Sequence, residues 1–178
     1  MFKHSSIVFK GLQIIAWIIF VGICIEAAAL LVNFIFGFIR PDLLSRLYEK
    51  LDLTDLYAEN KPAYIGIYSF IISLSALKAY LFYAIISLMR NFDLENPFQM
   101  KTSKQILNLC YTTLSIGLIS YIGQKTVSSL PLNHFETSRI SHFWVDTEAF
   151  LLTSAIIYVL SYIYYRGVEI QHENDLTV

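Results

Sequence analysis

The chain has 178 residues, of which 56% are hydrophobic and only 15% charged, and its mean hydropathy is +0.54. A soluble domain usually carries about 25% charged residues, so this chain has too few charges to cover a surface that faces water. Its net charge of -1, without a cluster of Lys or Arg, argues against direct binding of DNA or RNA. The composition therefore indicates an integral membrane protein, with the lipid bilayer as its first partner.

Four apolar segments predict four transmembrane helices over about residues 11–38, 64–89, 104–126 and 143–165, because a bilayer takes about 20 residues of helix. The first run is longer than the roughly 7 to 15 apolar residues of a signal sequence, so we expect it to be retained. Residues 39–63 and 127–142 are then outer loops, residues 90–103 an inner loop, and residues 166–178 a polar tail. The predicted fold is all-α: a polytopic integral membrane protein with one membrane domain over residues 1–178, folded as an antiparallel bundle of four transmembrane helices.

The outer loop between the first two spans contains leucines at the spacing of one helical face, with charged residues between them: Leu43, Leu44, Leu47 and Leu51. This pattern predicts a short extracytoplasmic amphipathic helix that lies in the membrane interface. Packing on the bundle as a lid is the simpler interpretation, because apolar helical stripes usually serve packing. A partner-binding surface is the alternative.

The third span is the least apolar, and we expect it to lie inside the bundle. It carries Asn108 and Gln124, and polar side chains in a bilayer favour helix–helix contacts where they find hydrogen-bond partners. Just before it, Asn96 and Pro97 are typical of a helix start, as the cap and the first helical residue. The connection from the second span is short, so the third helix must run antiparallel to the second.

The orientation depends on where the cationic residues lie. Lys and Arg divide evenly between the two sides, but one set lies directly next to the ends of the spans: Lys3, Lys10, Arg90, Lys101, Lys104 and Arg166. The other set lies mostly in longer loops rich in Asp and Glu. Because the positive-inside bias is read close to the helix ends, we expect a multi-pass protein with both termini in the cytoplasm.

Two ionisable residues lie within the predicted spans, Glu26 in the first and Lys78 in the second. Either one alone costs about 2.5 to 3.5 kcal/mol at mid-bilayer, so each should face the bundle and seek a partner. In antiparallel neighbouring helices, their levels differ by at most about one helical turn. The structural hypothesis is an intramembrane ion pair that sets the register of two helices, and the functional one is a pair that senses protons or a ligand.

Few residue patterns indicate chemistry. His134, Glu136 and His142, followed by Asp146 and Glu148, form a candidate metal group on the outer side. No tight His or Cys spacing supports it, and polar loops collect such residues by default. The spans also lack a Gly-x-Ser-x-Gly turn and a Gly-rich phosphate loop. We therefore expect neither a metal, nor a cofactor, nor an enzyme.

Two stretches resemble a known family: Asn96-Pro97-Phe98, and the ending from Arg166-Gly167-Val168-Glu169 to Val178. With four spans in this length, they are similar to the bacterial membrane family catalogued as domain of unknown function 2975. The resemblance implies no activity, substrate or cofactor. Its members are often encoded beside small helix-turn-helix regulators, which implies a cytoplasmic transcription factor as partner and the bacterial cytoplasmic (inner) membrane as location.

The ending is acidic, with Glu169, Glu173 and Asp175 after the single cation Arg166. The simpler interpretation is a last helix that runs on into water and frays. The sharper one is a cytoplasmic docking tail for a basic partner.

Two functions follow as hypotheses. The first is a non-enzymatic regulatory or interaction protein that works with a cytoplasmic partner such as a helix-turn-helix regulator. The second is a small transporter or channel subunit, in which Glu26, Lys78, Asn108 and Gln124 line a path formed in a homo-oligomer.

Overall fold

The structure is a computed structural model that describes residues 2–39, 51, 53–93, 97–130 and 137–175. Within these ranges every regular element is a helix. Four are long: α1 (Phe2–Ile39), α4 (Lys61–Asn91), α5 (Met100–Ser129) and α6 (Thr147–Asp175). Two are short: α3 (Thr54–Glu59), and η3 (Thr137–Phe143), which is a 3-10 helix.

The four long helices confirm the predicted all-helical membrane fold, because each is long and apolar enough to cross a membrane. The shortest, α6, has 29 residues. At about 1.5 Å per residue it is roughly 43 Å long, more than the hydrocarbon core of about 30 Å. Large apolar side chains are exposed along the helices, among them Ile18 and Ile25 of α1 and Leu152 and Ile163 of α6. An apolar surface of this extent is suited to lipid.

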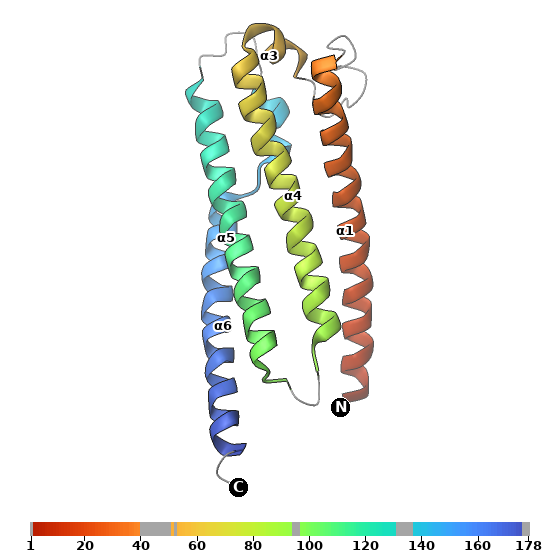
Figure 1. The fold of residues 1–178 in the computed structure, drawn as a ribbon, viewed down its shortest axis with the longest axis vertical. Coiled ribbons are helices and arrows are strands. Elements are labelled where there is room, and N and C mark those ends of the chain that lie inside the picture. The colour runs from red at the N-terminus through yellow and green to blue at the C-terminus, as the bar shows by residue number, and fades with distance from the viewer. Residues whose placement is uncertain (1, 40–50, 52, 94–96, 131–136, 176–178) are drawn as a thin grey trace.

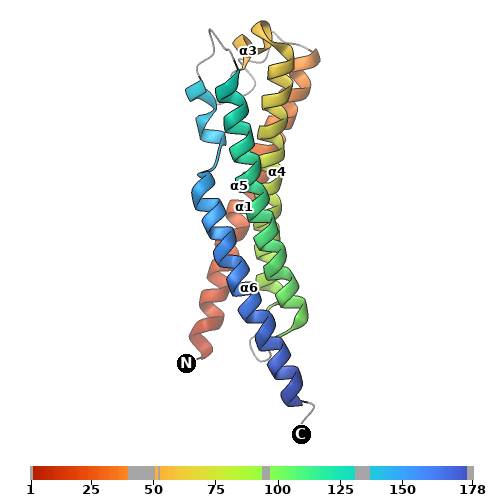
Figure 2. The ribbon, with the colours of Figure 1, turned by 90° about the vertical axis from the view of Figure 1, so that its left-hand side faces the viewer.

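The long helices form a row in chain order and alternate in direction (Figures 1 and 2). α1 packs on α4, α4 on α5, and α5 on α6. Among the described residues, α1 makes at most marginal contact with α5 and α6, so the row does not close into a ring. Both termini lie at one end, which we call the terminal end, and α3 lies at the other, which we call the lid end (Figure 1).

Two helix starts correct the sequence prediction. α6 begins at Thr147 rather than at residue 143, because η3 ends at Phe143 and Asp146 caps the new helix, accepting a hydrogen bond from Ala149 N at 3.1 Å. α5 begins at Met100 rather than at Pro97, after an extended Gln99. α6 also continues to residue 175, well past the predicted end of the fourth span.

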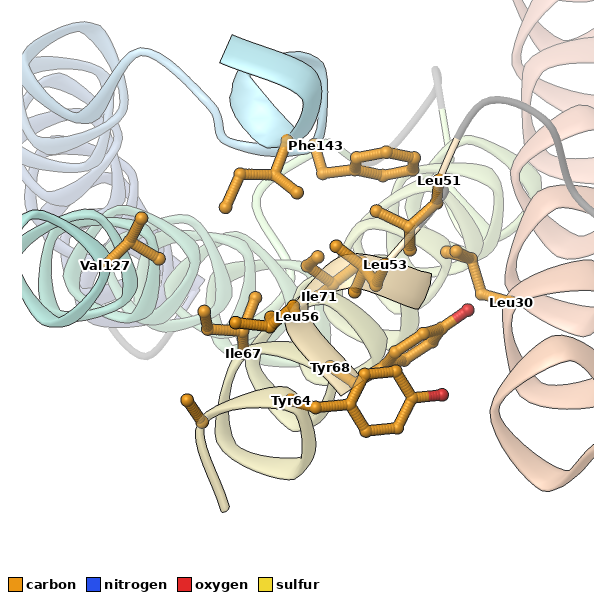
Figure 3. Close-up of a cluster of buried hydrophobic side chains, with 12 residues drawn as sticks. Leu30, Leu51, Leu53, Leu56, Tyr64, Ile67, Tyr68, Ile71, Val127 and Phe143 are labelled. Atoms are coloured by element: carbon orange, nitrogen blue, oxygen red, sulfur yellow. The ribbon is translucent and has the colours of Figure 1, made fainter. Parts of the chain in front are cut away.

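A cluster of buried hydrophobic side chains lies at the lid end, where α3 and η3 close over α1, α4 and α5 (Figure 3). Leu51, Leu53 and Leu56 are at most 1% exposed. They belong to one cluster with residues of α1, α4, α5 and η3: Leu30, Ala63, Tyr64, Ile67, Tyr68, Ile71, Val127, Ile140 and Phe143. This end of the row is therefore closed by packing, although α6 does not reach it.

α3 confirms the short helix predicted between the first two spans, and it packs on α4. Leu51, the last leucine of the predicted stripe, is buried against the bundle, as a lid requires. Leu43, Leu44 and Leu47 lie outside the described residues. The amphipathic stripe as a whole stays a prediction.

Candidate functional site

Lys78 lies near the middle of α4 and reaches toward the segment that precedes α6. Its ammonium donates a hydrogen bond to the main-chain carbonyl of Phe143 at 3.1 Å. Phe143 is the last residue of η3, so this bond connects two elements that are far apart in the sequence. The lysine side chain is half-buried. Its partner is a backbone group, which the residue pattern did not predict.

Glu26 lies close to Lys78 across the contact between α1 and α4. Three ring contacts define the antiparallel register: Phe9 with Phe92, Phe20 with Tyr83, and Phe34 with Tyr68. They set Glu26 level with about residue 76, within about one helical turn of Lys78. The carboxylate acts on the ammonium electrostatically, but no direct ion pair joins these two described side chains. The Glu26 side chain is exposed, and a sensing role for it stays a prediction.

Residues 144–146 form a break in helical structure between η3 and α6 (Figure 2). The break lies level with Ser120, about 14 Å along α5 from its end. At membrane depth, unpaired main-chain groups are tolerated only where the protein or enclosed water satisfies them. The Ser120 hydroxyl accepts from Val145 N and donates to Val145 O, both at 3.1 Å. Gln124 donates to Val145 O at 3.2 Å, so α5 supplies partners for the break.

Trp144 fixes the same break by packing on Gly123. A Cβ atom at Gly123 would lie 2.4 Å from Cζ3 of the indole ring, so a larger residue would displace the tryptophan. Nearer the middle of α5, a Cβ atom at Gly117 would lie 3.2 Å from Cδ2 of Leu151. Small residues on α5 thus let α6 and the break approach closely, as is common for helix contacts in membranes.

The two polar residues predicted for the interior of the third span both bridge elements. Asn108 Nδ2 donates to the hydroxyl of Tyr80 on α4 at 3.0 Å. Gln124 Nε2 reaches Thr147 Oγ1 at 3.4 Å in addition to Val145. Gln124 is nevertheless exposed, because it lies at the edge of the contact with the break.

A pocket of about 440 Å³ opens beside the break. α5 contributes Tyr121, Gln124 and Lys125 to its lining, and the break and α6 contribute Asp146, Glu148 and Leu151. The Lys125 ammonium lies 5.8 Å from the centre of the Tyr121 ring. Opposite charges therefore line the two sides of one pocket. Sequence reasoning treated Asp146 and Glu148 as part of a metal group and did not connect them with Lys125.

The two stretches that carry the family resemblance meet at the terminal end. The centre of the Phe98 ring lies 5.3 Å from the centre of the Tyr164 ring. A Cβ atom at Gly167 would come within 2.7 Å of Cε1 of Phe98. Arg166 pairs with Glu169 at 2.9 Å and donates to the Tyr162 hydroxyl at 3.2 Å. The connection before α5 is thereby packed against α6 where the acidic segment begins.

The remaining predicted site residues are spread out. Glu173 lies one turn beyond Glu169, and Asp175 ends α6. His142 is exposed on η3, whereas His134 and Glu136 lie outside the described residues. In the part of the chain that the structure describes, no three His, Cys, Asp or Glu residues gather as a metal site would need. The candidate metal group stays untested.

Sequence reasoning missed a buried polar residue, Asn33, which is 1% exposed on α1. Among the described residues, neither its amide nitrogen nor its amide oxygen has a hydrogen-bond partner. The hydroxyl of Tyr64, fully buried on α4, is unpaired as well. An unsatisfied buried polar group costs about 1–3 kcal/mol, so each of these groups lowers the stability of the fold. An Asn within the first apolar run was the signal available in the sequence.

Comparison with known proteins finds a family model that covers most of the chain. A family model described as a protein of unknown function, DUF2975, matches residues 51–178, which covers every described element except α1. Both stretches that meet at Gly167 lie within the matched range. No curated protein and no solved structure matches the chain.

Proposed function

The chain belongs to the DUF2975 family of proteins of unknown function, and from this premise we propose a non-enzymatic membrane protein that binds a basic cytoplasmic partner. The acidic end of α6 is the proposed binding element. The observation that carries the proposal is that α6 continues as one helix from Thr147 to Asp175. The partner would therefore meet a formed helix rather than a frayed tail.

The end of α6 projects beyond the membrane in this proposal. Arg90, Lys101 and Arg166 mark the membrane edge at the terminal end, where a cationic bias indicates the cytoplasmic side. Phe98 packs against Gly167, so the start of α5 and Arg166 lie at a similar level. Residues 167–175 then extend past that edge as about two and a half turns of helix.

The charge of the projecting segment defines the partner. Residues 167–178 contain three carboxylates and no Lys or Arg. Glu169 and Glu173 are four residues apart and share one helix face, where like charges repel by roughly 0.2–0.5 kcal/mol. Arg166 offsets Glu169 through their ion pair. A partner with a cationic face would relieve the remaining repulsion and gain attraction.

A small helix-turn-helix regulator fits these requirements. Proteins that bind DNA carry faces rich in Lys and Arg, and such a face complements an acidic helix. The family resemblance implies the same kind of partner. The acidic end of α6 and DNA would then compete for the same basic surface of the partner. Binding to this chain would keep the transcription factor at the membrane and away from DNA.

The test is co-sedimentation of a purified small helix-turn-helix regulator with inside-out vesicles that contain the full chain. The variant Glu169→Gln/Glu173→Gln/Asp175→Asn should lose most of the binding, and high salt should weaken binding to the unmodified chain. The control, Glu59→Gln in α3 with Glu148→Gln in the first turn of α6, removes acidic charge away from the proposed binding element and should bind normally. Equal retention by all three proteins would refute the docking role.

A second candidate, a small transporter or channel subunit, is favoured by the exposure of Glu26. An isolated carboxylate in hydrocarbon costs about 2.5 to 3.5 kcal/mol, so a second copy or water would have to cover it. Proton flux into liposomes that contain the purified chain tests this idea. Flux that Glu26→Gln abolishes would support the candidate, and flux no faster than that of empty liposomes would reject it.

A further inference from the structure

The pocket beside the break carries unpaired charges of opposite sign. Lys125 on α5 and Glu148 in the first turn of α6 both line it. Within the described residues neither forms an ion pair, although both belong to one lining. The ammonium of Lys125 lies over the face of the Tyr121 ring, 5.8 Å from its centre. Both residues line one pocket of about 440 Å³.

The second carboxylate of the pocket has a structural task. Asp146 Oδ1 accepts the hydrogen bond from Ala149 N and so caps α6. Glu148 is exposed and has no such task. The pocket therefore presents one ammonium and one available carboxylate, with a net charge of -1 once Asp146 is included. A ligand with only negative charge would be repelled overall.

The depth of the pocket is set by α5. Lys104 and Lys125 lie on this one helix, 21 residues apart, which corresponds to about 31 Å along its axis. The hydrocarbon core is about 30 Å thick. If Lys104 lies at one edge of the core, Lys125 lies at the other, where phospholipid headgroups begin. Leu151, one turn into α6, extends the lining toward the hydrocarbon.

From this arrangement we infer that the pocket binds the headgroup of a zwitterionic phospholipid with a primary ammonium. The phosphate lies against Lys125, and the lipid ammonium donates to Glu148. The acyl chains leave along Leu151 and the exposed ring of Tyr121. A trimethylated ammonium has no N–H group to donate, and an anionic headgroup meets two carboxylates, so both should bind less well. This inference does not depend on the docking role of the end of α6.

The test uses the full-length chain in detergent and native mass spectrometry, which counts bound lipids. Three phospholipids with identical acyl chains are compared: phosphatidylethanolamine, phosphatidylcholine and phosphatidylglycerol. We expect one phosphatidylethanolamine to be retained in preference to the other two. Loss of one charge-assisted hydrogen bond, in Lys125→Gln or in Glu148→Gln, should lower its affinity about tenfold. The matched control, Lys101→Gln at the other end of α5, should bind like the unmodified chain.

Two results would overturn the inference. One is equal retention of the three lipids by the unmodified chain, a comparison that needs no variant to fold. The other is unchanged retention of phosphatidylethanolamine by both pocket variants. Circular dichroism checks that each variant keeps its helical content. A variant that loses helix is replaced by Lys125→Met or Glu148→Ala, so that the comparison can be completed.

Discussion

The ammonium of Lys78 and the carbonyl of Phe143 are joined by a hydrogen bond of 3.1 Å that ties the middle of α4 to the end of η3. Together with Ser120 and Gln124, this lysine satisfies main-chain groups that the break before α6 leaves without helical partners. A charged side chain in a membrane span can therefore stabilise the backbone of a neighbouring segment. This role differs from the two roles predicted for a pair of Lys78 with Glu26, which were setting the helix register and sensing protons or a ligand.

Replacing Lys78 tests that task. Lys78→Met should destabilise the protein by about 1–3 kcal/mol, because the Phe143 carbonyl loses its donor. In a chain of this size that corresponds to a thermal midpoint lower by about 2–4 °C for each kcal/mol. Lys78→Arg keeps a donor and should recover most of the loss. Lys101→Met, an exposed change at the terminal end, serves as the control, and equal midpoints for it and Lys78→Met would contradict the assignment.

Ser120 is predicted to matter more than other serines of α5. Ser120→Ala leaves Val145 N without an acceptor and should cost about 1–3 kcal/mol. The matched control is Ser115→Ala, because the Ser115 hydroxyl donates its hydrogen bond to Tyr111 O, within the same helix, at 2.8 Å. Thermal unfolding in detergent compares the two variants. A larger loss for Ser115→Ala would argue against the role of α5 at the break.

The packing of Trp144 on Gly123 predicts a steric effect. Gly123→Ala places a methyl group within 2.4 Å of the indole ring, and such overpacking typically costs about 1–3 kcal/mol. Trp144 should move, which changes the tryptophan fluorescence. Gly22→Ala has open space around the new atom and should be neutral or stabilise α1 by up to about 1 kcal/mol. A fluorescence spectrum unchanged by Gly123→Ala would show that the ring does not lie there.

Much of this architecture could be predicted from composition, and the break could not. The four spans and the short helix follow from long apolar runs and helical spacing, because the bilayer imposes both length and polarity. Phe143, Trp144 and Val145 are apolar as well, so they resembled the start of a span. Only Asp146, a capping residue, marked the true start of α6.

The candidate site shows the same limit. Lys78 and Glu26 stand out in the sequence because charges are rare in spans, yet the direct partner of Lys78 is a backbone carbonyl. Every residue has such a group, so no residue pattern identifies it. The opposite charges of Lys125 and Glu148 come together only because α6 starts late, a consequence of tertiary packing.

Replacing Asn33 should raise the stability of the protein, whereas the replacements of Lys78, Ser120 and Gly123 should lower it. Its amide is buried without a partner among the described residues, so Asn33→Leu should stabilise the protein by about 1–3 kcal/mol through removal of the desolvation cost. The thermal midpoint should rise. Val32→Leu, on the exposed side of α1, is the control and should change little. A marked fall of the thermal midpoint in Asn33→Leu would mean that the amide has a bound partner such as water.

The docking role requires the acidic end of α6 to face the cytoplasm, and cysteine labelling in intact cells measures this directly. In a background of Cys24→Ala and Cys110→Ala, the changes Ala58→Cys in α3 and His172→Cys in α6 each introduce one exposed thiol. A reagent that cannot cross membranes should label position 58 in intact cells and position 172 only after the cells are opened. Labelling of position 172, but not of position 58, in intact cells would contradict the proposed orientation and with it the docking role.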